Sequence, residues 1–202
     1  MSTRNKILVG ILIFLVSYPV FLLVWIYLKP YYGTLINGFG SRLAAWSMDV
    51  TMEKIESGKE LSKITFAKPV LTKDGLQDLL LDLNMSVSVY AFNIPLTFAL
   101  IVSLLPFFHW QKRSYLEAGV ILVAVHVLFV FSFCCVKIYM ALIKTGLAPR
   151  SGIQQFILEF LWSFTDNLII RFEPFLMIVY LWLRNAYRRT GTDPRASEKA
   201  GG

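Results

Sequence analysis

Long apolar segments divide the chain into membrane and water-facing parts. The first, Ile7–Leu28, contains no charged residue and, at about 1.5 Å per residue, is long enough to cross roughly 30 Å of hydrocarbon. Because it runs into Lys29-Pro30 and not into a small-x-small cleavage site, it is predicted to stay as an uncleaved signal anchor. The simplest prediction is four transmembrane helices: Ile7–Leu28, Ala91–Phe108, Ala118–Val136 with a continuation to Ile143, and Leu168–Leu183.

The sizeable polar stretch between the first two spans, residues 29–90, carries two different periodicities. From Tyr31 to Ile55 apolar residues recur mainly every three or four positions, which predicts an amphipathic helix. From Leu79 to Tyr90 they alternate with mostly polar residues, which predicts a strand, with Ile64–Val70 as its partner across a turn at Thr72–Gly75. The predicted fold class is therefore an α-helical membrane protein with four transmembrane helices plus a small extracytoplasmic helix and β-hairpin segment.

The remaining segments complete the predicted organisation. Residues 153–164 carry apolar side chains on one helical face, which predicts an outer interfacial helix or an extension of the fourth span. Residues 188–202 are polar and aperiodic, which predicts a disordered cytoplasmic tail. The predicted domains are residues 1–28 (cytoplasmic N-terminus and signal anchor), 29–90 (extracytoplasmic helix-hairpin domain), 91–187 (three-helix membrane domain with its outer helix) and 188–202 (the tail).

Composition and charge agree with an integral membrane protein in contact with the lipid bilayer. The chain is 56% hydrophobic, with a mean hydropathy of +0.59, which is too apolar for an ordinary soluble domain. A nucleic-acid partner is not expected, because the excess positive charge flanks the apolar segments and does not cluster on one polar face. The positive-inside rule then predicts cytoplasmic termini. The basic residues that carry this prediction are Arg4 and Lys6, Lys112 and Arg113, and Arg184, Arg188, Arg189, Arg195 and Lys199.

Polar residues within or beside the last two apolar segments are the candidate site residues, because ionisable side chains inside a membrane are costly and mark functional positions. At the standard helical rise, His126 lies about 13 to 14 Å from the inner face and Glu173 about 16 to 22 Å, so the two are a candidate pair. Lys137 and Asp166 form a second candidate pair nearer the outer face. The full set is His126, Cys134, Lys137, Asp166, Arg171 and Glu173.

Several interpretations of these residues stay open at this stage. Arg171 and Glu173 fit snorkelling at the outer interface, a buried structural pair, or a catalytic or transport role. Pro174 removes the backbone hydrogen bond to the carbonyl of Ile170, so a kink is predicted there and the neighbouring Arg171 is expected to satisfy the freed carbonyl. His126 alone is typical of a core histidine that bonds a neighbouring helix.

The chemistry of a metal site or a disulfide is not predicted. A metal needs at least three converging ligands, and His109 lies at the cytoplasmic end, far from the other candidates. Cys134 and Cys135 are adjacent, which rarely permits a bridge between them, and both are interpreted as small packing residues. No cofactor is expected.

The stretch Ser86-Val87-Ser88-Val89-Tyr90-Ala91-Phe92-Asn93-Ile94-Pro95-Leu96, where the predicted strand leads into the second span, resembles the exosortase H-associated membrane proteins. The resemblance also covers the layout of the whole chain. It implies a bacterial inner-membrane protein with an accessory role in protein sorting, an exosortase-like membrane partner and no family catalytic residues. A homo-oligomer is also compatible with it.

Two other function classes are compatible with the sequence. A membrane-embedded cysteine peptidase or transpeptidase-like enzyme would use Cys134, Arg171 and His126, although eight residues separate His126 from Cys134, about 12 Å along a helix and beyond hydrogen-bond reach. A small transporter or channel component is suggested by His126 and Glu173 at matched depth.

Overall fold

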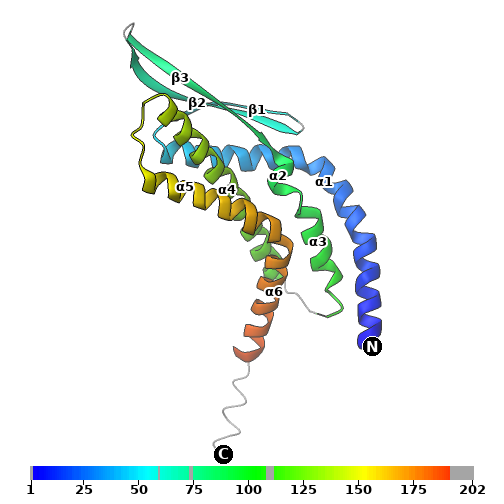
Figure 1. The fold of residues 1–202 in the computed structure, drawn as a ribbon. Helices are drawn as coiled ribbons and strands as arrows, with labels where there is room; N and C mark the ends of the chain where they lie inside the picture. The colour runs from blue at the N-terminus through cyan, green and yellow to red at the C-terminus, as the bar shows by residue number, and fades with distance from the viewer. Residues whose placement is uncertain (1, 59, 73–74, 108–111, 192–202) are drawn as a thin grey trace, which may run out of the picture. The chain divides into compact units, whose positions relative to one another are not determined.

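The computed structural model describes residues 2–58, 60–72, 75–107 and 112–191. It is mostly helical with one small sheet (Figure 1). The elements in order are α1 (Thr3–Ser47), β1 (Thr51–Ser57), β2 (Leu61–Thr72), β3 (Gly75–Ser86), α2 (Val87–Ala91), α3 (Ile94–Ser103), α4 (Lys112–Lys144), α5 (Gly152–Phe164), the π-helical segment η1 (Thr165–Ile170) and α6 (Arg171–Gly191).

The chain divides into two compact units. The sheet-bearing unit comprises Val24–Asn93 and Val123–Arg171, and the terminal unit comprises Met1–Leu23, Ile94–Leu122 and Phe172–Gly202. Helices α1 and α4 each contribute to both units, so each unit has its own helical frame.

Two helices in the described part of the chain are long and apolar enough to cross a membrane. They are Thr3–Ser47 and Tyr115–Lys144, which contain 18-residue stretches with mean hydropathies of 2.8 and 2.7. The predicted second span is shorter in the structure, because helix α2 ends at Ala91 and α3 covers only Ile94–Ser103. Ten residues of helix measure about 15 Å, so α3 alone does not cross the hydrocarbon. The four predicted spans are thus not confirmed as four.

Helix α1 continues without interruption through Lys29 and Pro30, where the sequence predicted a boundary between a span and a separate helix. It ends at Ser47, since Asp49 adopts a left-handed conformation (φ 51°) and the N–H of Val50 bonds to the carbonyl of Ala45 at 3.0 Å. This is the Schellman arrangement that terminates helices. The predicted helix over residues 31–55 is therefore wrong beyond Ser47, and Thr51–Ser57 forms β1 instead.

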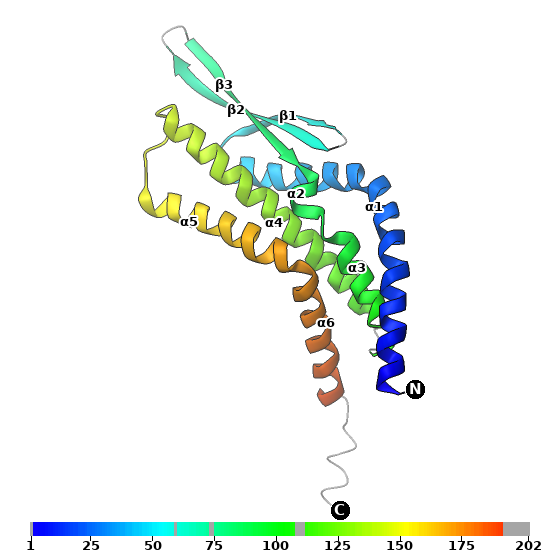
Figure 2. The same ribbon diagram turned by 45° about the vertical axis from the view of Figure 1, so that its right-hand side comes forward.

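The predicted hairpin is present as β2 and β3. The two strands pair antiparallel in a continuous register from Leu61↔Ser86 to Thr72↔Gly75, and the turn residues 73–74 lie outside the described residues. Strand β3 ends at Ser86, so the predicted strand is wrong over Val87–Tyr90, which belong to α2. The sequence prediction also missed β1, which pairs with β2 and completes a sheet of order β1-β2-β3 (Figures 1 and 2).

The last helices form one uninterrupted helical stretch. The predicted helix over 153–164 is present as α5, and it continues through η1 into α6. A π-helical segment inside a longer helix is uncommon and is frequent near functional sites. Helix α6 extends to Gly191, so the predicted disorder is wrong for residues 188–191, and the rest of the tail lies outside the described residues.

Candidate functional site

A chain of buried hydrogen bonds fixes the sheet to helices α1 and α2 in the sheet-bearing unit. The Asn37 amide donates from Nδ2 to Ser62 Oγ of β2 at 2.8 Å, and its Oδ1 accepts from the Tyr90 hydroxyl of α2 at 2.9 Å. None of the three side chains is more than 1% exposed. Because a buried polar group left unsatisfied costs about 1–3 kcal/mol, this geometry strongly favours one placement of β2 on the helices.

His126 is buried next to this chain of hydrogen bonds. Its ring is fully buried on α4 and packs against the rings of Tyr32 and Tyr90. Its Nδ1 lies 2.5 Å from the Tyr32 hydroxyl of α1, a hydrogen bond whose donor depends on the imidazole tautomer. Tyr32, His126 and Tyr90 thus join α1, α4 and α2, as the interpretation of a helix-bonding core histidine expects.

Lys29 of α1 and Glu60, the residue before β2, form an ion pair in the same unit. The Lys29 ammonium lies 2.6 Å from both carboxylate oxygens of Glu60 and 2.5 Å from the Ser88 hydroxyl. The Lys29 side chain is only 14% exposed, whereas that of Glu60 is 66% exposed. The hydrogen bonds from Lys29 and Ser88 hold the pKa of the Glu60 carboxyl below its usual range.

Cys134 is enclosed where α1 and α4 pack together. Its side chain is 0% exposed, and its Sγ lies 3.8 Å from the Ser41 hydroxyl. The neighbouring contact is tight, because a Cβ placed on Gly40 would lie 2.7 Å from Val130 Cβ. The thiol therefore lies in a close-packed helix contact with no exposed surface for a substrate to reach.

The freed carbonyl at the proline has a different partner from the one predicted. Pro174 has no N–H to offer the carbonyl of Ile170, and that oxygen instead accepts from Asn93 Nδ2 at 2.6 Å. The expectation that Arg171 satisfies it is therefore wrong, and Arg171 is exposed. Asn93 interrupts an otherwise apolar stretch, Tyr90 to Leu96, which was the signal that sequence analysis could have used.

Glu173 is buried in the terminal unit and is 2% exposed. Its Oε1 accepts a hydrogen bond of 3.0 Å from the Thr97 hydroxyl of α3, which is also buried. Snorkelling of Glu173 towards water does not fit this burial. Its pairing with His126, a residue of the other unit, stays a prediction.

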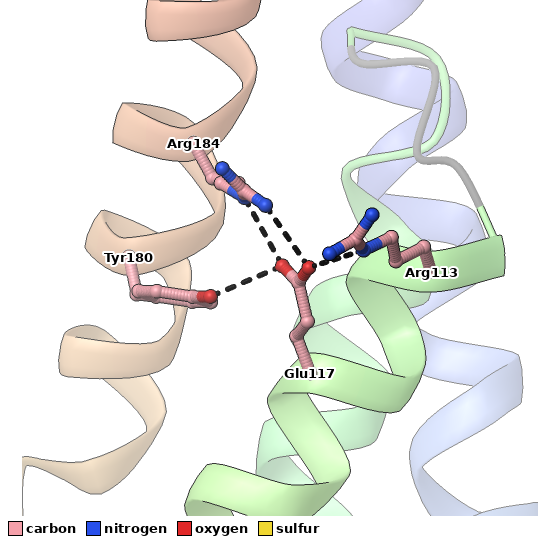
Figure 3. A network of polar contacts seen from close by, with 4 residues as sticks. All are labelled: Arg113, Glu117, Tyr180 and Arg184. Carbon is pink, nitrogen blue, oxygen red and sulfur yellow. Dashed lines mark hydrogen bonds and ion pairs between the residues drawn. The ribbon is translucent and has the colours of Figure 1, made fainter.

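Glu117 forms a second polar centre in the terminal unit that the sequence did not single out (Figure 3). Arg184 of α6 donates to both of its carboxylate oxygens, from Nη2 at 3.0 Å and from Nε at 3.1 Å. Tyr180 donates to Oε2 at 3.1 Å and Arg113 donates to Oε1 at 3.0 Å. Two-point binding by a guanidinium is geometrically specific, so this cluster fixes the facing turns of α4 and α6.

The other predicted residues do not converge on a site. Lys137 is exposed, and its ammonium lies 5.5 Å from the ring centre of Phe133. Asp166 is half-buried in η1, and among the described residues no ion pair joins it to Lys137. Among all the residues that the structure describes, no three His, Cys, Asp or Glu side chains lie together as a possible metal site.

In comparisons with known proteins, a protein-family model matches most of the chain. The model of the family described as exosortase H-associated membrane protein matches residues 1–185. No curated protein and no solved structure matches the chain. The match covers both long apolar helices, the sheet and the polar clusters described above, and so extends over most of the chain. The chain therefore belongs to the exosortase H-associated membrane protein family.

Proposed function

We propose that this chain is a non-catalytic accessory protein of an exosortase-type protein-sorting system, and that its sheet-bearing unit presents the surface that the exosortase contacts. The family name supports the association. The observation that carries the choice of surface is the buried hydrogen-bond chain from Ser62 through Asn37 to Tyr90, which gives a small sheet a fixed position. A surface held in one geometry loses little freedom on binding and so binds more tightly.

The enzyme alternative receives no comparable support. A nucleophilic cysteine needs access to substrate and a base within hydrogen-bond reach. The Cys134 side chain is 0% exposed and contacts Ser41, and the Nδ1 of His126 contacts Tyr32. The buried thiol is instead typical of a packing residue.

Two measurements test the accessory role. The tagged full-length protein, solubilised in mild detergent, is expected to co-purify with the exosortase encoded in the same cell. The variant Cys134→Ala is expected to keep sorting intact at normal protein abundance. Purification of the protein without any exosortase would reject the partner, and loss of sorting at normal abundance would contradict the assignment of Cys134 as a packing residue only.

The proposal includes a topology with both termini in the cytoplasm of a bacterial inner membrane and the sheet outside. The basic residues at the flanks of the apolar segments support it. Green fluorescent protein fused to either terminus should fluoresce, whereas alkaline phosphatase inserted into the turn between β2 and β3 should be active. An inactive phosphatase insertion in a stably expressed protein would contradict the outside location of the sheet.

A further inference from the structure

Strand β3 forms one edge of the sheet, since the strand order is β1-β2-β3. It is 12 residues long and pairs with β2 along its whole length. In an antiparallel pair, every second residue of an edge strand turns its N–H and C=O away from its partner. The strands β2 and β3 extend beyond the helices of the same unit (Figures 1 and 2), so β3 offers a long row of backbone donors and acceptors.

The two edges of the sheet are built differently. Strand β1 is 7 residues long, has a register shift between Met52 and Lys54, and carries Glu53, Lys54 and Glu56. Short length, bulges and charges are the devices that keep an edge from pairing with another chain. Strand β3 has a continuous register and contains no proline, lysine or arginine, and its charged residues are Asp78 and Asp82, of which Asp82 pairs with Lys63 of β2 at 2.9 Å. Strand β3 is thus the longer and more regular edge, with fewer of the features that hinder the addition of a strand.

The outward face of β3 defines the chemistry of a strand that could join it. Along this face leucine and aspartate alternate, as Leu76, Asp78, Leu80 and Asp82. Leu76 is 73% exposed and Leu80 is 61% exposed, so both leave apolar surface uncovered. A neighbouring strand that places apolar residues beside the leucines and a basic residue beside Asp78 would match both properties.

A second copy of the chain is a poorer match for the same edge. If two β3 strands paired antiparallel about Leu80, Asp78 of each copy would face Asp82 of the other, and like charges opposite one another destabilise a sheet. A lipid surface would leave the row of backbone groups without strand partners.

We propose that the free edge of β3 binds an extended segment of a partner protein as a fourth strand, and that this segment alternates apolar and basic residues on the outward face. Backbone hydrogen bonds to β3 supply affinity, and contacts with Leu76, Asp78 and Leu80 supply selectivity. This inference deepens the proposed function. It rests on the proposed function only for the assumption that the partner is a protein.

Photo-crosslinking of the full-length protein in its native membrane tests this placement. p-Benzoylphenylalanine replaces Gln77, an exposed residue of β3, and in a matched experiment replaces Glu56, an exposed residue of β1. Position 77 is expected to give an adduct with another protein whose crosslinked peptide alternates apolar and basic residues, and position 56 is not. An adduct with a second copy or with lipid, equal adducts at both positions, or no adduct at position 77 would each overturn the proposal.

Surface variants keep the test independent of folding. Leu80→Lys, at a 61% exposed position on the edge, should abolish the adduct at position 77. Leu61→Lys makes the same change at a 59% exposed position on the central strand β2 and should preserve the adduct. Equal loss in both variants contradicts edge binding. If an exosortase co-purifies but position 77 gives no adduct, this inference alone fails. If position 77 gives the expected adduct with a protein that is not an exosortase, and no exosortase co-purifies, the proposed function alone fails.

Discussion

Replacement of Tyr90 by phenylalanine tests whether the sheet is held by buried hydrogen bonds in addition to apolar packing. Tyr90 is 0% exposed, and its hydroxyl donates to Asn37 Oδ1 at 2.9 Å. Phenylalanine keeps the ring, so the expected loss is that of one buried acceptor without its donor, about 1–3 kcal/mol. For a chain of this length each kcal/mol corresponds to a fall in melting temperature of about 2–4 °C.

The assay is the melting of the detergent-solubilised full-length protein, followed by fluorescence-detected size-exclusion chromatography after heating. Tyr31→Phe is the matched control, because it removes the same hydroxyl from a side chain that is 78% exposed, and it should stay within about 0.5 kcal/mol of the unmodified protein. Asn37→Ala should melt lower than Tyr90→Phe, since it removes partners from both Tyr90 and Ser62. If Tyr90→Phe and Tyr31→Phe melt together, the hydrogen bond does not stabilise the sheet and the reasoning is refuted.

Two further predictions use the same melting assay. Gly40→Ala should destabilise the protein by about 1–3 kcal/mol through overpacking, because the new Cβ would lie 2.7 Å from Val130 Cβ. Gly119→Ala is the control, because nothing lies within 4 Å of its new Cβ, and it should be neutral or stabilising. Equal effects of the two substitutions would refute the close contact at Gly40. Because the pKa of Glu60 is lowered from its ordinary value of 4.5 by Lys29, their contact stabilises the fold above that value and is lost as the pH falls through the lowered pKa. The melting temperature of Glu60→Gln should therefore fall below that of the unmodified protein at neutral pH and converge with it in acid, and a gap that widens in acid would contradict the assignment.

Features that depend on local periodicity could be predicted from the sequence, whereas features that depend on contacts between distant segments could not. The alternation over Leu79–Ser86 and the apolar run within Ala118–Ile143 reflect which face of each element is in contact with apolar surroundings, so strand β3 and helix α4 could be predicted. The helical periodicity of residues 31–55 does not show where α1 ends. The left-handed Asp49 ends α1, and residues 51–57 find a strand partner in β2, which periodicity alone does not reveal.

The hydrogen-bond partners of the polar residues in the candidate site could not be predicted from the sequence. His126 was predicted as a helix-bonding residue, but its partner Tyr32 is 94 residues away. The carbonyl freed by Pro174 was assigned to the adjacent Arg171, whereas Asn93, 77 residues from Ile170, satisfies it. Each partner became identifiable only when distant segments were packed against one another.

The sequence by itself determined the membrane character of the chain, the two long apolar helices, the β2–β3 hairpin and, through residues 86–96, the family resemblance. These follow from local periodicity and length, because a helix or strand must match the apolar surroundings on each of its faces. The tertiary structure alone decided the third strand, the enclosure of Cys134, the hydrogen-bond chain through Asn37 and the cluster at Glu117. The physical reason is that a buried polar group requires a partner but does not specify which one, and only packing brings the donor and the acceptor together.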